Sequence, residues 1–215
     1  VGCTIFHDDV AWLGHIIVHP NHRQKGIGQF ITKTLIDIAL TRCSTINLIA
    51  TDMGAPVYEK LGFTTITNYL FFENIQILNQ NISISNIVSY QPQFYEQVLK
   101  LDKICSSENR ISLYKDYLTR GLVYLDNEEV KGFYLPEFGE GLLIANNFEA
   151  GISLLKYHLN NKSNVIVFPE DNLLLQNFLH SLGYKPYRVA KRLMLGNKRV
   201  LNLEMMFGRI AGNIG

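Results

Sequence analysis

The chain has 215 residues, enough for two small domains that each bury a core. Its 20 Lys and Arg residues nearly balance 19 Asp and Glu residues, so the formal charge of +1 predicts no nucleic-acid or anionic-membrane partner. Three scattered cysteines with no C-x-x-C pair argue against a disulfide framework and a zinc site, so we expect a cytoplasmic protein without a metal. The sequence also lacks a run of about 18 apolar residues that would predict a membrane span.

The first third of the chain alternates between strand and helix patterns. Apolar residues recur with helical spacing at Ile27, Ile31, Leu35 and Ile38. We predict strands over 1–6 and 12–18, a helix over 27–42, a strand over 46–50, a helix over 55–61 and a strand over 63–72. Because the opening residues already have a strand pattern, we expect the numbering to begin inside a domain whose first elements are missing.

The residues after 87 repeat this order of elements. We predict helices over 94–104 and 111–120, strands over 121–125 and 130–135, and then strand, helix, strand and helix over 141–145, 152–159, 165–168 and 173–182. Leu182-Gly183-Tyr184 follows Leu61-Gly62-Phe63 by 121 residues, which indicates a tandem pair of α/β units. An accidental recurrence of a common element order is the alternative.

An uncharged segment rich in Asn, Gln and Ser predicts a connector between the two units. We therefore predict an N-terminal domain over 1–78, a connector over 79–87 and a C-terminal domain over 88–215. The expected fold class is α/β with mixed sheets.

The segment from Val18 to Gly28 leaves a predicted strand and enters the long helix. Gly26 and Gly28 lack the Cβ atom that would keep a phosphate away from the backbone, and first-turn N–H groups favour anions. Arg23 or Lys25 would add positive charge. The alternative is that this segment is an ordinary glycine-containing turn. Its sequence matches neither the Walker motif nor the dinucleotide-binding motif.

The string V-x-P-x-x-R-x-x-G-x-G resembles the acyl-CoA-binding motif of the GNAT superfamily, usually written Q/R-x-x-G-x-G/A. Arg23, Gly26 and Gly28 fill its defining places. The stretch from Ala55 to Phe63 is similar to the second signature of that superfamily, in which a Tyr stands four residues before a Gly. The resemblance covers residues 1 to 72.

The resemblance implies acetyl-CoA as cosubstrate and assigns roles to particular positions. The strand end formed by Ile16, Ile17 and Val18 would pair its backbone with the acetyl and pantetheine amides. Thr51 stands where these enzymes often have an Asn that contacts the cofactor, and Tyr58 would be the general acid that protonates the departing thiolate. The pyrophosphate would be held, together with Arg23, by Gln24, Lys25, Gly26, Ile27, Gly28 and Gln29.

We therefore expect an N-acetyltransferase that acts directly on a primary amine of a small molecule or peptide. The base that takes the amine proton is not identified, and His15, Asp52 and Glu73 are candidates near strand ends. The alternative role for Tyr58 is structural, with its ring packed under the helix. A non-catalytic acyl-CoA sensor is the alternative function, and a purely structural tandem domain is a third hypothesis.

The second half contains the pieces Leu101-Asp102, Asn109-Arg110-Ile111-Ser112-Leu113, Val130-Lys131-Gly132-Phe133 and Lys191-Arg192-Leu193-Met194-Leu195-Gly196. With these pieces it resembles the C-terminal domain that is fused to certain bacterial acetyltransferases, and the resemblance implies a degenerate GNAT fold. Such a domain would wall the active site and help to select the acceptor. Its loop over 146–151 has a single Gly and no Arg or Lys, and Leu179 stands at the position of Tyr58, so we expect it to bind no CoA. Asp102 and Arg110 are either an acceptor-binding pair or an exposed ion pair at a helix end.

Overall fold

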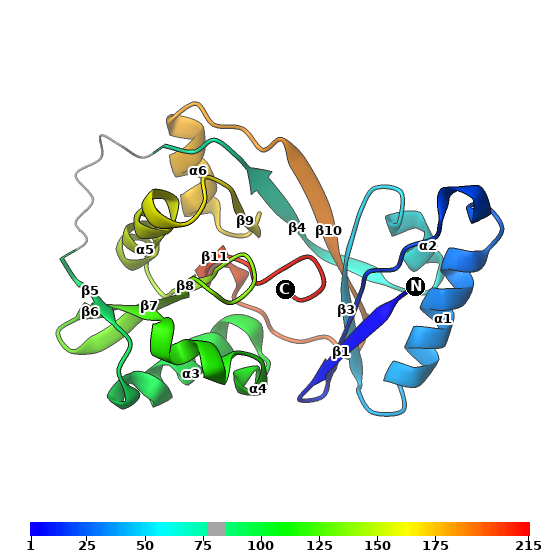
Figure 1. Cartoon of the computed structure of the whole chain (residues 1–215), viewed down its shortest axis with the longest axis horizontal. Coiled ribbons are helices and arrows are strands. Elements are labelled where there is room, and N and C mark those ends of the chain that lie inside the picture. Colours follow the sequence, from blue (N-terminus) through cyan, green and yellow to red (C-terminus); the bar gives the residue numbers. More distant parts are fainter. Residues whose placement is uncertain (77–84) are drawn as a thin grey trace. The chain divides into compact units, whose positions relative to one another are not determined.

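The computed structural model describes residues 1–76 and 85–215 (Figure 1). The chain forms two compact units, each of which collects separate stretches of sequence. The first unit contains residues 1–68, 190–199 and 211–215, and the second contains residues 69–189 and 200–210. The predicted mixed α/β fold class is confirmed. The predicted connector over 79–87 lies mostly outside the described residues, and the linear division into domains 1–78 and 88–215 stays a prediction.

The first unit is built on a mixed sheet. Strands β1 (Cys3–His7) and β2 (Val10–Gly14) are antiparallel, β2 is parallel to β3 (Thr45–Ala50), and β3 is antiparallel to β10 (Arg188–Gly196). The strand order is β1-β2-β3-β10-β4-β9, in which β4 (Thr64–Phe72) and β10 each run from one unit into the other. The 3₁₀ turn η1 (Pro20–His22) and the helices α1 (Ile27–Ala39) and α2 (Ala55–Lys60) complete this unit. A late strand is therefore part of the sheet that the N-terminal residues form.

Two element boundaries in the first unit differ from the prediction. The strand predicted over 12–18 ends at Gly14, because His15 has a φ of 50° and turns the chain out of the ladder. The helix predicted over 27–42 ends at Ala39, and turn hydrogen bonds follow it.

The buried face of α1 is also shifted from the predicted one. Leu35 packs against the core as predicted and Ile31 is partly buried, but Ile27 and Ile38 are 36% and 47% exposed. Their places on the core side are taken by neighbouring residues with helical spacing, Thr32, Ile36 and Ala39, which are buried. Apolar residues spaced by four, four and three show that a helix has an apolar side, but not which residues on that side are buried. Tertiary packing decides this.

The second unit begins with a second sheet, in the order β11-β8-β7-β6-β5. Its strands are β5 (Ile87–Ser89), β6 (Leu122–Asp126), β7 (Glu129–Leu135), β8 (Leu142–Ala145) and β11 (Met206–Gly208), and β9 (Ile166–Pro169) pairs with β4. Its helical elements are η2 (Pro92–Phe94), α3 (Tyr95–Ser106), α4 (Ile111–Tyr114), η3 (Lys115–Arg120), α5 (Phe148–Asn161), α6 (Leu173–Ser181) and η4 (Leu203–Met205).

Two predictions for the second unit need correction, and one strand was not predicted. The helix predicted over 111–120 is α helix only as far as Tyr114 and continues as 3₁₀ helix. The helix predicted over 152–159 begins at Phe148, because Asn147 caps it by accepting a hydrogen bond from Ala150 N at 2.8 Å. Strand β11 has no strong pattern of its own, and the sequence did not predict it.

Helices α2 and α6 share their capping geometry at an offset of 121 residues. Both end in a glycine of positive φ, Gly62 at 92° and Gly183 at 87°. The equivalent hydrogen bonds are Ala55 N to Thr51 O and Gln176 N to Asn172 O at the start, and Phe63 N to Tyr58 O and Tyr184 N to Leu179 O at the end. This agreement at the level of single bonds favours the interpretation of a tandem repeat.

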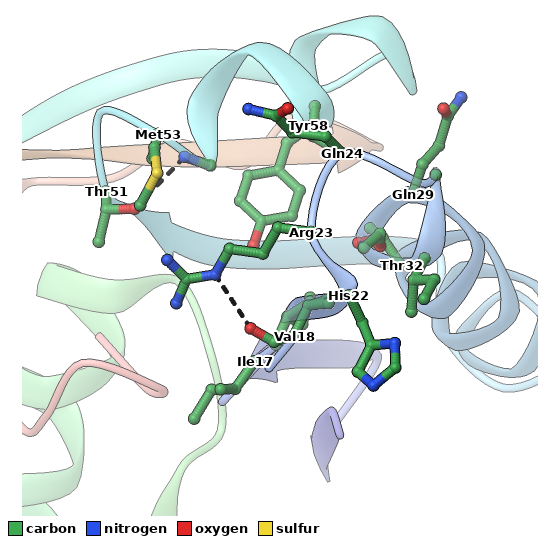
Figure 2. A pocket seen from close by; sticks show the side chains of 16 residues that line it. Ile17, Val18, His22, Arg23, Gln24, Gln29, Thr32, Thr51, Met53 and Tyr58 are labelled. Atoms are coloured by element: carbon green, nitrogen blue, oxygen red, sulfur yellow. Dashed lines mark hydrogen bonds between the residues drawn. The ribbon is translucent and has the colours of Figure 1, made fainter. Parts of the chain in front are cut away.

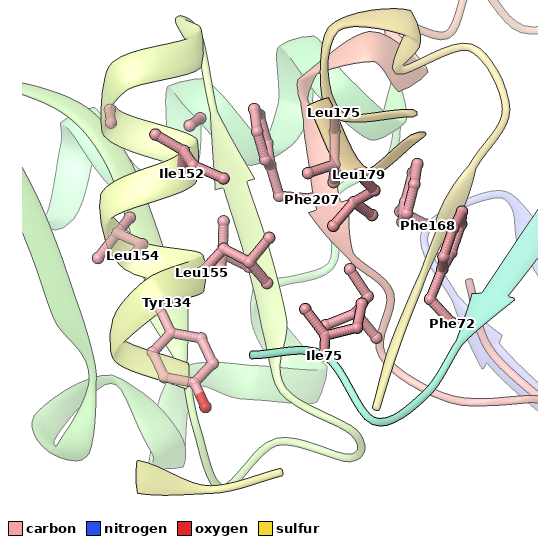
Figure 3. Packing of buried hydrophobic residues seen from close by; sticks show 14 of the residues in the cluster. Phe72, Ile75, Tyr134, Ile152, Leu154, Leu155, Phe168, Leu175, Leu179 and Phe207 are labelled. Atoms are coloured by element: carbon pink, nitrogen blue, oxygen red, sulfur yellow. The ribbon is translucent and has the colours of Figure 1, made fainter. Parts of the chain in front are cut away.

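A continuous apolar core fills the second unit (Figure 3). Phe72 from β4 stacks on Phe168 from β9 with ring centroids 5.4 Å apart. Leu175 and Leu179 of α6 and Phe207 of β11 belong to the same cluster and are 2% exposed or less. Burial of each such side chain contributes roughly 1.5–3 kcal/mol, so β11 is an integral part of this core.

The buried side chain of His158 makes the second unit sensitive to acid. Its Nδ1 lies 2.7 Å from the Tyr134 hydroxyl and its Nε2 lies 3.2 Å from Val165 O, which suits a neutral ring that accepts at one nitrogen and donates at the other. Burial lowers the pKa of His158, and the charge of Lys162 lowers it further. The unfolded chain therefore binds a proton more readily than the native chain.

We expect the melting temperature to fall as the pH is lowered below the ordinary imidazole pKa of about 6.5, because the native state resists this protonation. The stabilising contribution is complete above that pH and is lost below it. Thermal melts between pH 7.5 and 5 test this, with His158→Gln as the control that cannot titrate. Equal pH dependence of the wild type and the variant would contradict the prediction.

The pair formed by Asp102 and Arg110 is buried, so its interpretation as an exposed ion pair is wrong. The side chains are 2% and 1% exposed. Arg110 Nε donates to Asp102 Oδ2 at 3.3 Å, and the Tyr114 hydroxyl donates to the same oxygen at 3.2 Å. Such a pair holds α3 and α4 together. Its role in acceptor binding stays a prediction.

Candidate functional site

The first unit contains an open pocket of about 570 Å³ (Figure 2). Its walls are the segment after β2, the start of α1, and the segment that joins β3 to α2. Of the predicted site residues, the structure places around it Ile16, Ile17, Val18, Arg23, Gln24, Gly26, Ile27, Gly28, Gln29, Thr51 and Tyr58. Lys25 does not line the pocket, since its Nζ is directed to Asn21 O at 3.4 Å.

The segment after β2 lies along one wall of the pocket, although it belongs to no strand. Ile17 exchanges two hydrogen bonds with Val1, both at 2.9 Å, so its backbone faces away from the pocket. Neighbouring residues of an extended chain point their backbone groups in opposite directions, so those of Ile16 and Val18 face the other side. The Val18 carbonyl accepts a hydrogen bond from Arg23 Nε at 3.1 Å. The remaining groups can pair with an extended ligand that carries amides.

The start of α1 forms an anion cradle. Gly26 is the N-cap residue with a φ of 75°, and no side chain caps the helix, whose first bond runs from Phe30 N to Gly26 O at 2.9 Å. Gln24 also has a positive φ of 60°. A Cβ atom added at Gly28 would meet only Val18 Cγ2, at 3.7 Å. The first-turn N–H groups and the positive end of the helix dipole therefore face a space that side chains leave open.

Positive charge at the pocket comes from Arg23, and the imidazole of His22 is a second basic group among the lining residues. The Arg23 side chain is directed to the Val18 carbonyl (Figure 2). His22 was not predicted, although it stands inside the motif, directly before Arg23.

Thr51 begins the turn that leads from β3 into α2. Its carbonyl accepts from Gly54 N and Ala55 N, both at 2.9 Å, and its hydroxyl also accepts from Gly54 N, at 3.3 Å. The side chain thus supports the turn that leads into α2, the helix that carries Tyr58.

Tyr58 points from α2 into the pocket (Figure 2). The edge of its ring packs against Phe63 with centroids 6.1 Å apart, and the side chain is half-buried. No hydrogen-bond partner of its hydroxyl is found among the described residues. Burial raises the pKa of Tyr58, so the phenol keeps its proton at neutral pH.

The sequence prediction missed several lining residues, namely His22, Thr32, Met53, Gly54 and Val57. Thr32 follows Gly28 by one helical turn, so helix periodicity could have indicated it. The others flank motif residues. None of the three candidate bases lines the pocket: His15 and Asp52 are exposed next to it in sequence, and Glu73 belongs to the second unit.

Residues 1–65 match the family model of the acetyltransferase (GNAT) domain. A search of the curated proteins found no match. Over its described residues the chain has no helix long and apolar enough to cross a membrane, and no group of three His, Cys, Asp or Glu side chains placed to hold a metal.

The fold resembles solved GNAT-type structures. A Pyrococcus horikoshii protein with a provisional acetyltransferase assignment aligns with a TM-score of 0.85 and 22% identity, over 100% of this chain and 75% of that one. A tandem GNAT protein from the clavulanic acid biosynthesis pathway aligns with a TM-score of 0.54 and 14% identity, over 89% and 76%. A Thermoplasma acidophilum protein, also with a provisional acetyltransferase assignment, gives 0.53 and 15%, over 91% and 73%. These likenesses establish the fold.

Proposed function

We propose that this chain moves an acetyl group from acetyl-CoA to a primary amine by direct transfer. The observation that carries the proposal is the pocket of the first unit, which brings together the segment that follows β2, a helix start with two glycines and no side-chain cap, and a half-buried Tyr. The match of residues 1–65 to a GNAT domain supports it. The acceptor would be an amine on a small molecule or a peptide.

Backbone groups would bind the cosubstrate. The pantetheine arm has amides that can pair with the free groups of Ile16 and Val18 as an added strand would. The pyrophosphate would lie against the N–H groups of Ile27, Gly28 and Gln29, with Arg23 adding charge. Lys25, which was assigned to this site from the sequence, would contribute only from outside the pocket.

The transfer needs one proton delivered and one removed. The neutral amine attacks the thioester carbonyl, the carbon–sulfur bond breaks, and the thiolate takes the proton of the Tyr58 hydroxyl, which solvent then restores. The raised pKa of Tyr58 favours the protonated form that this step requires. The proton released by the amine passes to water, and none of the three candidate bases lines the pocket.

Replacing Tyr58 by Phe tests the chemistry. We expect kcat to fall about 100-fold, the lower end of the range for general acid–base catalysis, while the Kd for acetyl-CoA stays within about threefold. Thiol release in the presence of a panel of primary amines measures kcat, and calorimetry measures Kd. An unchanged kcat would remove the acid role from Tyr58.

The sensor alternative makes a different prediction in the same experiment. A non-catalytic module would bind acetyl-CoA with the same dependence on the cradle but release no thiol with any amine. Binding without turnover would therefore favour the sensor over the enzyme.

Changing Thr51 to Asn is expected to tighten acetyl-CoA binding. At the equivalent position of the second unit, Asn172 caps α6 through its Oδ1 and still donates from Nδ2 to a backbone carbonyl at 3.2 Å. An Asn at position 51 would keep the hydrogen bond from Gly54 N and direct a new donor into the pocket. One net hydrogen bond of about 0.5–1.5 kcal/mol corresponds to a roughly 2- to 12-fold lower Kd by calorimetry. A weaker affinity with an unchanged melting temperature would contradict this.

A further inference from the structure

We infer that strand β11 occupies, inside the second unit, the place that corresponds to the pocket of the first unit. The C-terminal segment would thus be a built-in replacement for the pantetheine arm. On the proposed function, each chain then binds a single acyl-CoA.

The two places correspond because the elements around them follow the same order. The first pocket lies beyond β2, at the start of α1 and between β3 and α2. In the second unit β8, α5, β9 and α6 take these positions, and α2 and α6 share their cap hydrogen bonds at the 121-residue offset. The counterpart of the pocket is therefore the space beside β8 and β9.

Strand β11 fills the edge that the first unit leaves open. It pairs antiparallel with β8, with Met206 opposite Ile144 and Gly208 opposite Leu143. On its other side, Arg209 N donates to Val167 O of β9 at 3.0 Å. An extended peptide and a pantetheine arm both offer amide donors and acceptors to such an edge. The second unit satisfies these groups with its own backbone.

Asn172 joins β11 to this site. It is the counterpart of Thr51 and is 2% exposed. Its Oδ1 accepts from Leu175 N at 3.1 Å, and its Nδ2 donates to Met206 O at 3.2 Å. The residue type that the GNAT resemblance places against the cofactor thus contacts the backbone of β11.

The helix start and the remaining space also exclude a ligand. Asn147 caps α5, whereas α1 has no side-chain cap. The Phe207 ring lies against Gly151, where any Cβ atom would overlap it. Phe207 thus takes up the space beside the first turns of α5.

The number of binding sites tests the inference. Calorimetric titration with acetyl-CoA is expected to give one equivalent per wild-type chain and none for Gly28→Glu. Two equivalents in the wild type, of which one remains in the variant, would overturn the inference. No binding by the wild type would instead remove the proposed function, and the placement of β11 is then tested without a ligand.

That ligand-free test compares Gly151→Ala in two backgrounds. Ala favours a helix more than Gly does. Gly151→Ala is therefore expected to raise the melting temperature unless another side chain occupies the space of the new Cβ atom. With Phe207 present we expect a fall of at least about 3 °C from overpacking, and with Phe207→Ala a change near zero or a rise. Phe207→Leu serves the same purpose if Phe207→Ala does not fold. Equal shifts in both backgrounds would overturn the placement of β11 in this site.

Discussion

Replacing Gly28 by Glu is expected to weaken acetyl-CoA binding at least about 100-fold, or by about 2.7 kcal/mol. The new carboxylate would stand at the start of α1, where no side chain caps the helix, and would compete with the pyrophosphate for the same N–H groups. It would also repel the phosphates at short range. Calorimetry measures the loss.

Gly28→Ala is the matched control. A Cβ at this position meets only Val18 Cγ2, at 3.7 Å, so the backbone and the fold tolerate it. We expect the melting temperatures of both variants to stay near that of the wild type and the affinity of Gly28→Ala to fall less than about tenfold. Equal losses in the two variants would show that bulk, rather than charge, disrupts the pocket. Unchanged binding by Gly28→Glu would mean that the phosphates lie elsewhere.

The sequence located the pocket because its residues lie close together along the chain. The residues that line it all fall within 16–58, so local motifs with known chemistry mark most of the wall. The motifs could not show which way the backbone groups and side chains point. Ile17 and Val18 look alike in sequence, but the pairing of Ile17 with Val1 decides which backbone groups face the pocket. Lys25 likewise lies in the motif and yet reaches only Asn21 O.

The pairing of strands that are far apart in the sequence was harder to predict than the pocket. Residues 188–196 have an ordinary strand pattern, and nothing local indicates that this strand enters the sheet between β3 and β4. Partner choice in a sheet depends on packing across many residues, whereas periodicity reports only which face of a strand is buried. Strand β11 was missed for a related reason, since its three residues are recognisable only by what they pair with.

The insertion of β10 has a large expected consequence for truncation: residues 1–78 alone should neither fold nor bind acetyl-CoA. Strand β3 would lose its ladder from Lys191 to Gly196, and the first core would lose Leu193, which is fully buried. The stacking of Arg192 on Trp12, with 4.6 Å from the guanidinium carbon to the ring centroid, would be lost as well. Because native domains are stable by only about 5–15 kcal/mol, removal of a central strand exceeds what the remainder can compensate. Circular dichroism and calorimetry on the fragment measure both losses.

A cut chain provides the control that separates covalent continuity from the presence of β10. A protease site placed at residues 79–84 allows the full chain to be cleaved after folding, and β10 then remains available to the first sheet. We expect the cleaved protein to keep its affinity for acetyl-CoA within about threefold, although the isolated fragment 1–78 binds none. If the isolated fragment folds and binds, β10 is dispensable to the pocket and the N-terminal residues are an autonomous domain. If the cleaved protein also loses binding, the connection itself is needed, and the pairing of β10 does not account for the effect.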